Sequence, residues 1–208
     1  MNSEHSALDY KPEIVMSHRV LGALSVLLIA AAGNVEGQSP WRFEVAGGAA
    51  FATEDLGNAS LGTGFGLEGT VGYRIQPHLW AYAGWDWHRF TSDGSAAADG
   101  DFDETGYAFG LQLEHPLRGS EAVALRLRAG GTYNHIEAEN AAGDLVADSD
   151  HGLGWEAGAG LAFRLNDRWQ VTPGARFRSL SRDLALGGPA TSADLRYIAV
   201  EVGFSRRF

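Results

Sequence analysis

Charged side chains recur at every second position along several stretches of this 208-residue sequence. Arg126 and Arg128 flank a leucine, and Arg176 and Arg178 flank a phenylalanine. A guanidinium can hold two carboxylate oxygens and stays charged when buried, so this spacing suits a network of Arg–carboxylate pairs. The predicted network comprises Arg42, Glu44, Glu68, Arg74, Asp86, His88, Glu114, Arg126, Arg128, Glu156, Arg164, Arg176, Arg178 and Glu201, with Arg207 on the same face.

Asp99, Asp101 and Asp103 lie at two-residue spacing and could supply the oxygen ligands that Ca²⁺ prefers. Their segment lacks the ligand order of an EF-hand loop and its distal bidentate Glu. We therefore expect a solvated acidic loop there and no bound metal. His135 is expected at the edge of an apolar face rather than on a metal.

Catalytic motifs are absent from the sequence. It has no Gly-x-Ser-x-Gly elbow, no His-Glu-x-x-His and no phosphate-cradling loop. Asp86 and His88, together with a loop serine such as Ser92, could imitate a hydrolase site. Neighbouring polar residues on one face are more often parts of a structural network, so we expect no catalytic residue and no cofactor.

The composition narrows the class of protein further. There is no cysteine, which excludes disulfides and thiolate metal sites. The formal net charge of −10 disfavours nucleic acid as a partner, because nucleic-acid binding rests on basic contacts to phosphates. The length suits one folded domain, or one domain plus a processed segment.

The N-terminal region predicts export. Residues 20–32 form an apolar run that is too short for a relaxed transmembrane helix but matches the core of a secretory signal peptide, with cleavage near Ala32. Residues 1–15 carry three acids and one Lys, the wrong charge for a signal's leading region. We predict an extension over 1–15 with the natural start at Met16, a signal peptide over 16–37 and a folded domain over 38–208. The alternative is a short amphipathic anchor.

The folded domain shows the period-two alternation of β-strands. Short connections rich in turn-forming residues alternate strictly with longer polar ones, the rhythm of an up-and-down meander. We predict an all-β, closed, antiparallel barrel of eight strands. The predicted strands are 41–51, 65–75, 79–90, 106–114, 123–134, 153–165, 169–178 and 197–208, joined by short turns at 76–78, 115–121 and 166–168 and by long loops at 52–63, 91–104, 137–152 and 181–194.

Pro173 falls inside the seventh predicted strand. Proline has no backbone N–H to donate to a ladder, so we expect a bulge or a local weakness there.

Alternation alone does not say which face of the barrel points inward. A soluble lipocalin-like barrel encloses its apolar face, whereas a membrane barrel exposes it to lipid. The polar face carries similar numbers of arginine and acidic residues, and most of its other residues are small. This composition favours a polar, salt-bridged interior. Aromatic residues near strand ends favour membrane-interface girdles on the outside. The girdle candidates are Trp41, Tyr73, Trp85, Trp87, Tyr133, Trp155, Trp169 and Phe208.

The signal peptide, the eight Gly-rich alternating strands and the terminal Phe208 resemble the small outer-membrane β-barrels of the OmpA transmembrane-domain, OmpX and opacity-protein kind. The resemblance covers about residues 38–208. It implies a place in the bacterial outer membrane, contact with outer-membrane lipid, and a last strand that the assembly machinery recognises. Phe208, Phe204, Val202 and Val200 fit that recognition pattern, while Arg206 stands where an aromatic or aliphatic residue is usual.

Four functions remain open at this stage. The leading one is a monomeric structural or surface-interaction barrel with a closed lumen, whose acidic loops at 91–104 and 137–152 face outward and could meet a surface ligand. The second is a narrow gated channel for small solutes, in which the same charge pairs swap partners. The third is a lipid-modifying enzyme like the outer-membrane lipid A deacylases. The fourth is a soluble lipocalin-like binder.

Overall fold

The computed structural model describes residues 39–56, 60–92, 100–140, 142–184 and 191–208. The predicted extension (1–15), the predicted signal peptide (16–37) and Asp99 lie outside these residues. Within the described ranges, no helix is long and apolar enough to cross a membrane. The strands are β1 (Trp41–Ala52), β2 (Thr63–Gln76), β3 (Leu79–Thr91), β4 (Asp101–Pro116), β5 (Val123–Glu139), β6 (Leu145–Asp148), β7 (Gly152–Arg164), β8 (Trp169–Leu184) and β9 (Thr191–Arg207).

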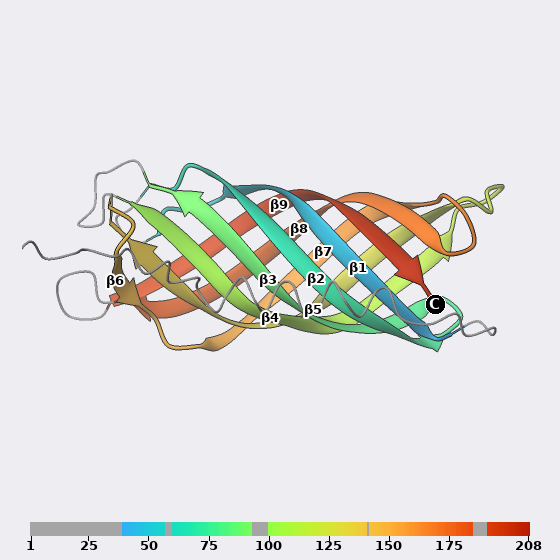
Figure 1. Cartoon of the computed structure of the whole chain (residues 1–208), viewed down its shortest axis with the longest axis horizontal. Coiled ribbons are helices and arrows are strands. Elements are labelled where there is room, and N and C mark those ends of the chain that lie inside the picture. The colour runs from blue at the N-terminus through green and yellow to red at the C-terminus, as the bar shows by residue number, and fades with distance from the viewer. Residues whose placement is uncertain (1–38, 57–59, 93–99, 141, 185–190) are drawn as a thin grey trace, which may run out of the picture. The chain divides into compact units, whose positions relative to one another are not determined.

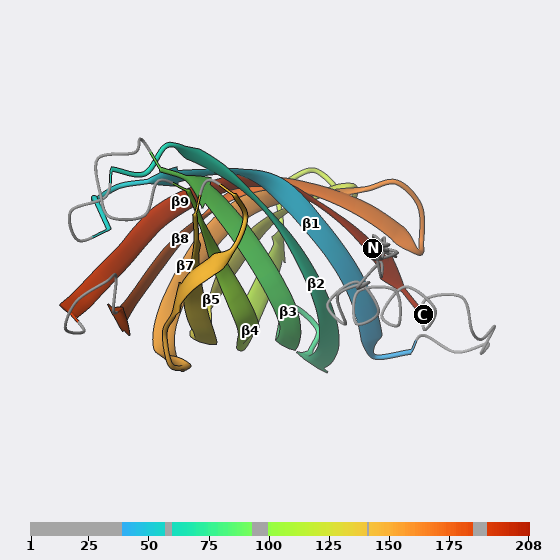
Figure 2. The same cartoon turned by 60° about the vertical axis from the view of Figure 1, so that its left-hand side comes forward.

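Eight long strands form a closed antiparallel barrel, which confirms the predicted fold. Each pairs with its neighbours in chain order, with β5 followed by β7, and β1 pairs with β9 to complete the circle. Figure 2 shows the strands tilted against the long axis of the barrel and curving round it. The short β6 pairs only with β5, over Glu137–Glu139, beyond the stretch that β5 shares with β7.

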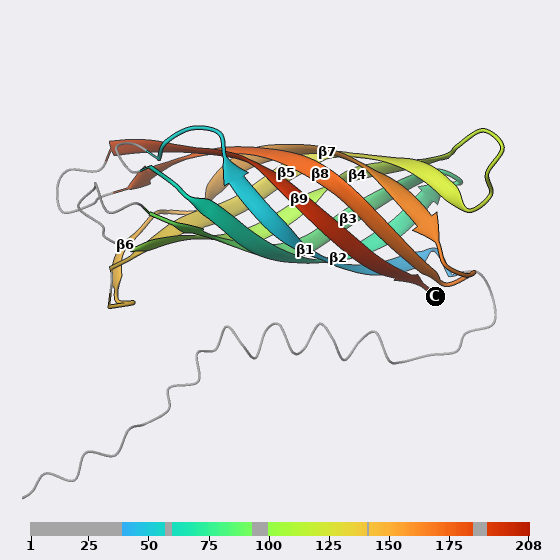
Figure 3. The same ribbon diagram turned by 90° about the horizontal axis from the view of Figure 1, so that it is seen from above.

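The two rims of the barrel differ. The C-terminal residue and the short connections lie at one rim, and β6 lies at the other, as Figures 1 and 3 both show. These rims are called the turn end and the loop end below. In membrane barrels short turns face the periplasm and longer loops face the cell exterior.

Over most of the barrel the apolar face points outward, as predicted. Exposed side chains there are leucine, valine, isoleucine and aromatic residues, whereas the interior is lined by charged and small residues. A soluble barrel with an apolar ligand cavity has the opposite arrangement, so this sidedness excludes the lipocalin-like alternative. Aromatic pairs lie on the outside near both rims, with ring centroids 4.9 Å apart for Trp41 and Tyr73 and 5.2 Å apart for Phe65 and Trp87.

Pro173 causes a local weakness but no bulge. The ladder between β7 and β8 has no pairs between Gly160–Gly174 and Phe163–Val171, and its register is the same on both sides of this gap. Pro173 still lies opposite Val202 in the regular β8–β9 pairing.

Three of the predicted long loops are strand over several residues, contrary to the prediction. Strand β4 begins at Asp101, β5 runs to Glu139, β8 runs to Leu184 and β9 begins at Thr191. The short β6 was also not expected. The predicted boundaries were wrong because the outward-facing residues turn polar at these positions, and that change was interpreted as the end of each strand.

The strands continue beyond this change with reversed polarity. On β9, the apolar Ile198 and Val200 point outward, but nearer the loop end the polar Ser192 and Asp194 do so while Leu195 is buried inside. A sheet surrounded by water has its apolar side chains inside and its polar side chains outside. The loop end of the barrel therefore has the surface of a protein in water, and the rest has a surface suited to lipid.

Candidate functional site

Charged side chains fill the barrel interior from the turn end upward, beginning with a group centred on Glu114 of β4. Arg42 of β1 and Arg126 of β5 lie 2.5 Å and 2.9 Å from one oxygen of Glu114, and Arg207 of β9 lies 3.1 Å from the other. Arg126 also lies 2.6 Å from Glu44. Four strands are thus joined through one carboxylate, whose oxygens have the donors that a buried charge requires.

A second group of charges lies further from the turn end. Arg128 lies 2.5 Å from Glu68 and 2.7 Å from Glu156. Arg176 also donates to Glu68 and lies 2.7 Å from Glu201. Each guanidinium therefore bridges two carboxylates from different strands, the geometry that the planar fork of arginine permits.

Arg178 of β8 is the centre of a third group. Its side chain is 0% exposed and lies 2.5 Å from Asp86, 3.1 Å from Glu104 and 2.9 Å from Glu156. The Tyr197 hydroxyl donates a hydrogen bond to Glu104. Glu156 links this group to the second one, so these two groups form a continuous network, and the group around Glu114 lies beside it nearer the turn end.

Aromatic rings pack among the charges. The guanidinium of Arg42 lies 4.3 Å from the ring centroid of Trp80, and that of Arg128 lies 3.9 Å from the ring of Tyr82. The Tyr82 hydroxyl donates to Glu156 at 2.6 Å. A Cβ atom at position 110 would lie 2.7 Å from this hydroxyl, so the glycine there makes room for the tyrosine. Such rings fill space that a charged pair alone would leave to water.

His88 lies within the third group but is not bonded to it. Its Nδ1 is 3.9 Å from Asp86 and 3.8 Å from Glu104, and it has no hydrogen-bond partner among the described residues. The imidazole packs beside Tyr197, with ring centroids 5.1 Å apart. His88 is also almost completely buried.

Two predicted members lie apart from the network. Arg164 is exposed near the turn end, and Arg74 is half-buried with its guanidinium 5.8 Å from the Trp80 ring. Neither forms an ion pair with a carboxylate in the part of the chain that the structure describes. Both stand close to strand ends, where the side chain can reach water instead of an interior partner.

Other members of the network were not predicted from the sequence. Glu104 was assigned to an acidic loop, yet it is buried in strand β4 beside Arg178. Gln112 and Gln170 both donate hydrogen bonds to Glu114, at 3.2 Å and 3.1 Å. Glu104 lies two residues before Gly106 and four before Ala108, so it falls on the same inward face of the strand. This spacing of two is the signal that could have identified Glu104 as an interior residue.

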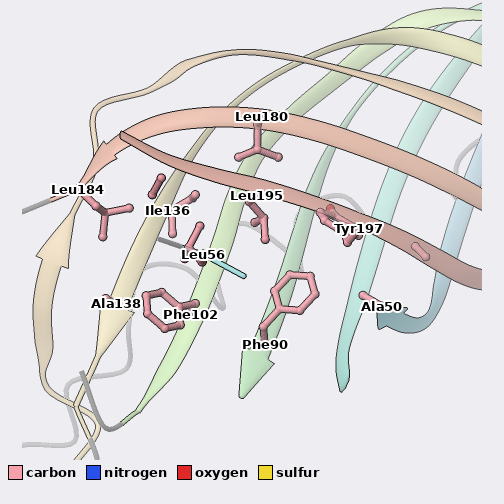
Figure 4. Close-up of a cluster of buried hydrophobic side chains, with 12 residues drawn as sticks. Ala50, Leu56, Phe90, Phe102, Ile136, Ala138, Leu180, Leu184, Leu195 and Tyr197 are labelled. Carbon is pink, nitrogen blue, oxygen red and sulfur yellow. The ribbon is translucent and has the colours of Figure 1, made fainter. Parts of the chain in front are cut away.

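Above the charges, an apolar cap closes the interior at the loop end (Figure 4). Figure 4 shows Phe90, Phe102, Leu195 and Tyr197 pointing toward one another inside the barrel, and Leu56 joins them from the segment after β1. The apolar cap consists of Ala50, Leu56, Phe90, Phe102, Ile136, Ala138, Leu180, Leu184, Ala193, Leu195, Tyr197 and Ala199.

A small cavity remains among the charges of the first and second groups. It offers about 30 Å³ and is lined by Glu44, Arg126, Arg128, Arg176 and Glu201 together with small residues of β7 and β8. A site needs about 10–15 Å³ of such space for one water molecule, so the cavity suits a water or two. It is too small for an organic solute.

The predicted acidic loop at 91–104 is different in the structure. Asp103 is paired with Arg89 of β3, whose Nε and Nη2 each donate to it at 2.6 Å, and Asp101 lies 3.6 Å from the same guanidinium. Asp99 lies outside the described residues. The two described aspartates therefore share an arginine.

The final strand presents its apolar side chains to the outside. Val200, Val202 and Phe204 are about half exposed on β9. Phe208 donates its backbone N–H to Trp41 at 3.2 Å, and its ring lies 5.1 Å from the guanidinium of Arg206. The terminal residue is thus held at the seam between β9 and β1.

Comparison with known proteins is consistent with this geometry. A family model described as "Outer membrane protein beta-barrel domain" matches residues 21–208. The fold is similar to the crystal structure of neisserial surface protein A, with a TM-score of 0.60 and 18% identity over 83% of this chain and 100% of that one. OprG from Pseudomonas aeruginosa is also similar, with a TM-score of 0.56 and 16% identity over 84% of this chain and 99% of that one. No curated protein sequence matches the chain.

Proposed function

Because the chain belongs to the outer membrane protein beta-barrel domain family, and is thus a small β-barrel of the bacterial outer membrane, we propose that it is a sealed structural or surface-interaction barrel. Its lumen is closed to solutes, and its function lies in the loop end that it holds outside the membrane. It needs no cofactor for this role.

One observation carries the proposal: the interior is filled along its length. The network of buried charges occupies the turn end and the middle, with Arg178 fully enclosed by carboxylates. The apolar cap then occupies the loop end. An ion that entered would have to displace paired charges and then cross the apolar cap, where most side chains cannot replace its hydration shell and the buried Arg182 is already bonded to Asn134, which is costly.

Planar-bilayer recording tests the sealed lumen. We expect no reproducible conductance steps from the folded protein, while a known open porin in the same bilayer gives steps and shows that the recording is sensitive. Reproducible steps from the wild-type protein would contradict the proposal.

A gated small-solute channel is the second candidate. Arg176 contacts both Glu68 and Glu201, and the small cavity lies beside it, so an exchange of partners could begin there. If steps are recorded, their size should change in Glu68→Gln and Arg176→Gln, but not in Arg164→Gln.

The enzymatic alternative receives less support. His88 and Asp86 are 3.9 Å apart, beyond the reach of the hydrogen bond that orients a catalytic base, and both are buried under the apolar cap. Because both side chains are buried, a lipid substrate outside the barrel cannot contact them in this structure.

Three further parts of the proposal concern partners. Phe208, Phe204, Val202 and Val200 form the segment that the assembly machinery would recognise. The acidic side chains of the loop end, such as Asp144 and Asp150, would face the cell exterior and suit a basic surface ligand. The barrel has no unpaired long edge among its described strands, which is consistent with a monomer.

A further inference from the structure

Three potential metal ligands gather on the outer surface at the loop end. One ligand atom each from His135, Glu137 and Asp148 lie within 4.8 Å of one another. Glu137 of β5 stands opposite Asp148 of β6, and His135 lies two residues earlier on β5, so alternation places all three on one face. None of them belongs to the interior network.

The three groups lie close enough to share a small cation after side-chain rotation. His135 Nδ1 lies 2.7 Å from Asp148 Oδ1, and His135 Nε2 lies 3.9 Å from Glu137 Oε1. Around a tetrahedral Zn²⁺ with bonds of about 2.0–2.1 Å, neighbouring ligand atoms are about 3.3 Å apart. These two distances involve different nitrogens of one imidazole, and a single ion binds only one of them. With one ligand atom from each residue the three lie within 4.8 Å of one another, so side-chain rotations that draw them closer would bring them to a shared ion.

A second imidazole lies against the first. The ring of His151 stacks on that of His135 with centroids 4.3 Å apart. His151 is exposed and follows β6 closely, so its side chain can turn toward the same ion. The Asp148 side chain is also 46% exposed, whereas that of Glu137 is 3% exposed. The buried Glu137 is therefore held in place, whereas Asp148 is open to ions from water.

The surrounding charge favours a cation. Arg89 lies on this outer face, and its ion pairs are with Asp101, Asp103 and Glu139. Arg182 approaches the same level from the interior, where it is bonded to Asn134 and Gly152. Asp103 stands opposite Glu137 across the β4–β5 pairing, so the carboxylates on this face outnumber the guanidinium. An excess of negative charge attracts divalent ions.

We propose that His135, Glu137 and Asp148 bind a divalent transition metal ion, with His151 or water completing the coordination. Imidazole nitrogen with carboxylate oxygen is a donor set that Zn²⁺ accepts. The ion connects β5 to β6 and so pins the segment between Glu139 and Gly152 at the loop end. Tyr133, a predicted girdle residue, precedes the site by two residues, which places the ion just outside the lipid.

Calorimetric titration with Zn²⁺ tests the site on full-length mature protein, folded in detergent and free of any polyhistidine tag. We expect one ion per barrel, with affinity reduced about tenfold or more in both His135→Gln and Asp148→Asn. His78→Gln and His115→Gln are matched controls, because these histidines pair at the turn end with ring centroids 6.1 Å apart, and they should bind as the wild type does.

Heat-modifiable gel migration verifies that each variant is folded before titration. As a second measurement, Zn²⁺ should slow hydrogen exchange of residues 145–148 in the wild type but not in His135→Gln. Two results would overturn the proposal: no Zn²⁺ binding by the wild type, which would leave His135–Asp148 as a simple hydrogen bond, or equal loss of affinity in His78→Gln and His135→Gln. Neither result bears on the sealed lumen, since none of these residues faces the interior.

Discussion

At the scale of single residues, buried arginines determine what the interior can do. Arg178 contacts Asp86, Glu104 and Glu156, so its removal would leave three enclosed carboxylates without their common cation. The desolvation of a buried charge is expensive, and only a full set of partners offsets it. Arg164 carries the same charge but is exposed, so water already solvates it.

These two arginines provide a matched prediction. Arg178→Leu should lower the free energy of unfolding by about 3–5 kcal/mol, because it breaks a buried ion pair by removing one partner. Arg164→Leu should change it by no more than about 0.5 kcal/mol. Urea titration in lipid vesicles, followed by tryptophan fluorescence, measures both. Equal losses in the two variants would show that the Arg178 network does not stabilise the barrel.

At the scale of elements, each long strand has two parts with different surroundings. Strand β9 has Val200 and Val202 outside near its middle, and Ser192 and Asp194 outside nearer the loop end. The interior changes in the opposite sense, from Glu201 to Leu195 and Ala193. The polarity reversal on β9 thus marks the level at which the barrel leaves the membrane.

Spin labels can locate this level directly. The chain has no cysteine, so Asp194→Cys and Val200→Cys each carry a single label. In lipid vesicles, the label at 194 should collide more with a water-soluble nickel reagent, and the label at 200 more with oxygen, which concentrates in lipid. Similar nickel accessibility at both positions would contradict a membrane boundary between them.

At the scale of the whole molecule, closure of the sheet separates two environments. Trp155 is 53% exposed on the outer face, whereas Trp80 is 2% exposed inside the barrel, stacked with Arg42. The two indoles are on opposite sides of a single layer of strands. Only closure gives the sheet an inside that lipid cannot reach.

Brominated lipid distinguishes these environments. Two variants that each keep one of the six tryptophans, with phenylalanine at the other five positions, isolate the signals. Bromine on the acyl chains should strongly quench the variant that keeps Trp155 and leave the one that keeps Trp80 nearly unchanged. Strong quenching of Trp80 would mean that lipid enters the interior.

Much of the fold could be predicted because its signals are local. Alternation over ten residues shows which side chains share a face, and turn-forming residues show where a strand reverses. Eight strands, their order and the outward apolar face followed from these patterns. The ends of β4, β5, β8 and β9 did not, because the strands extend into water, where the polarity of both faces reverses.

By itself the sequence determined which residues face inward, since the period of two is a property of the extended backbone. Only the tertiary structure decided which of them meet. Arg178 and Asp86 are 92 positions apart, and the tilt and stagger of the closed strands bring them to one level. The same stagger leaves Arg164 outside the network and brings Glu104 into it, whereas the separate pairing of β6 with β5 sets His135 beside Asp148. Contacts of this kind depend on how the sheet closes, and no local pattern records that.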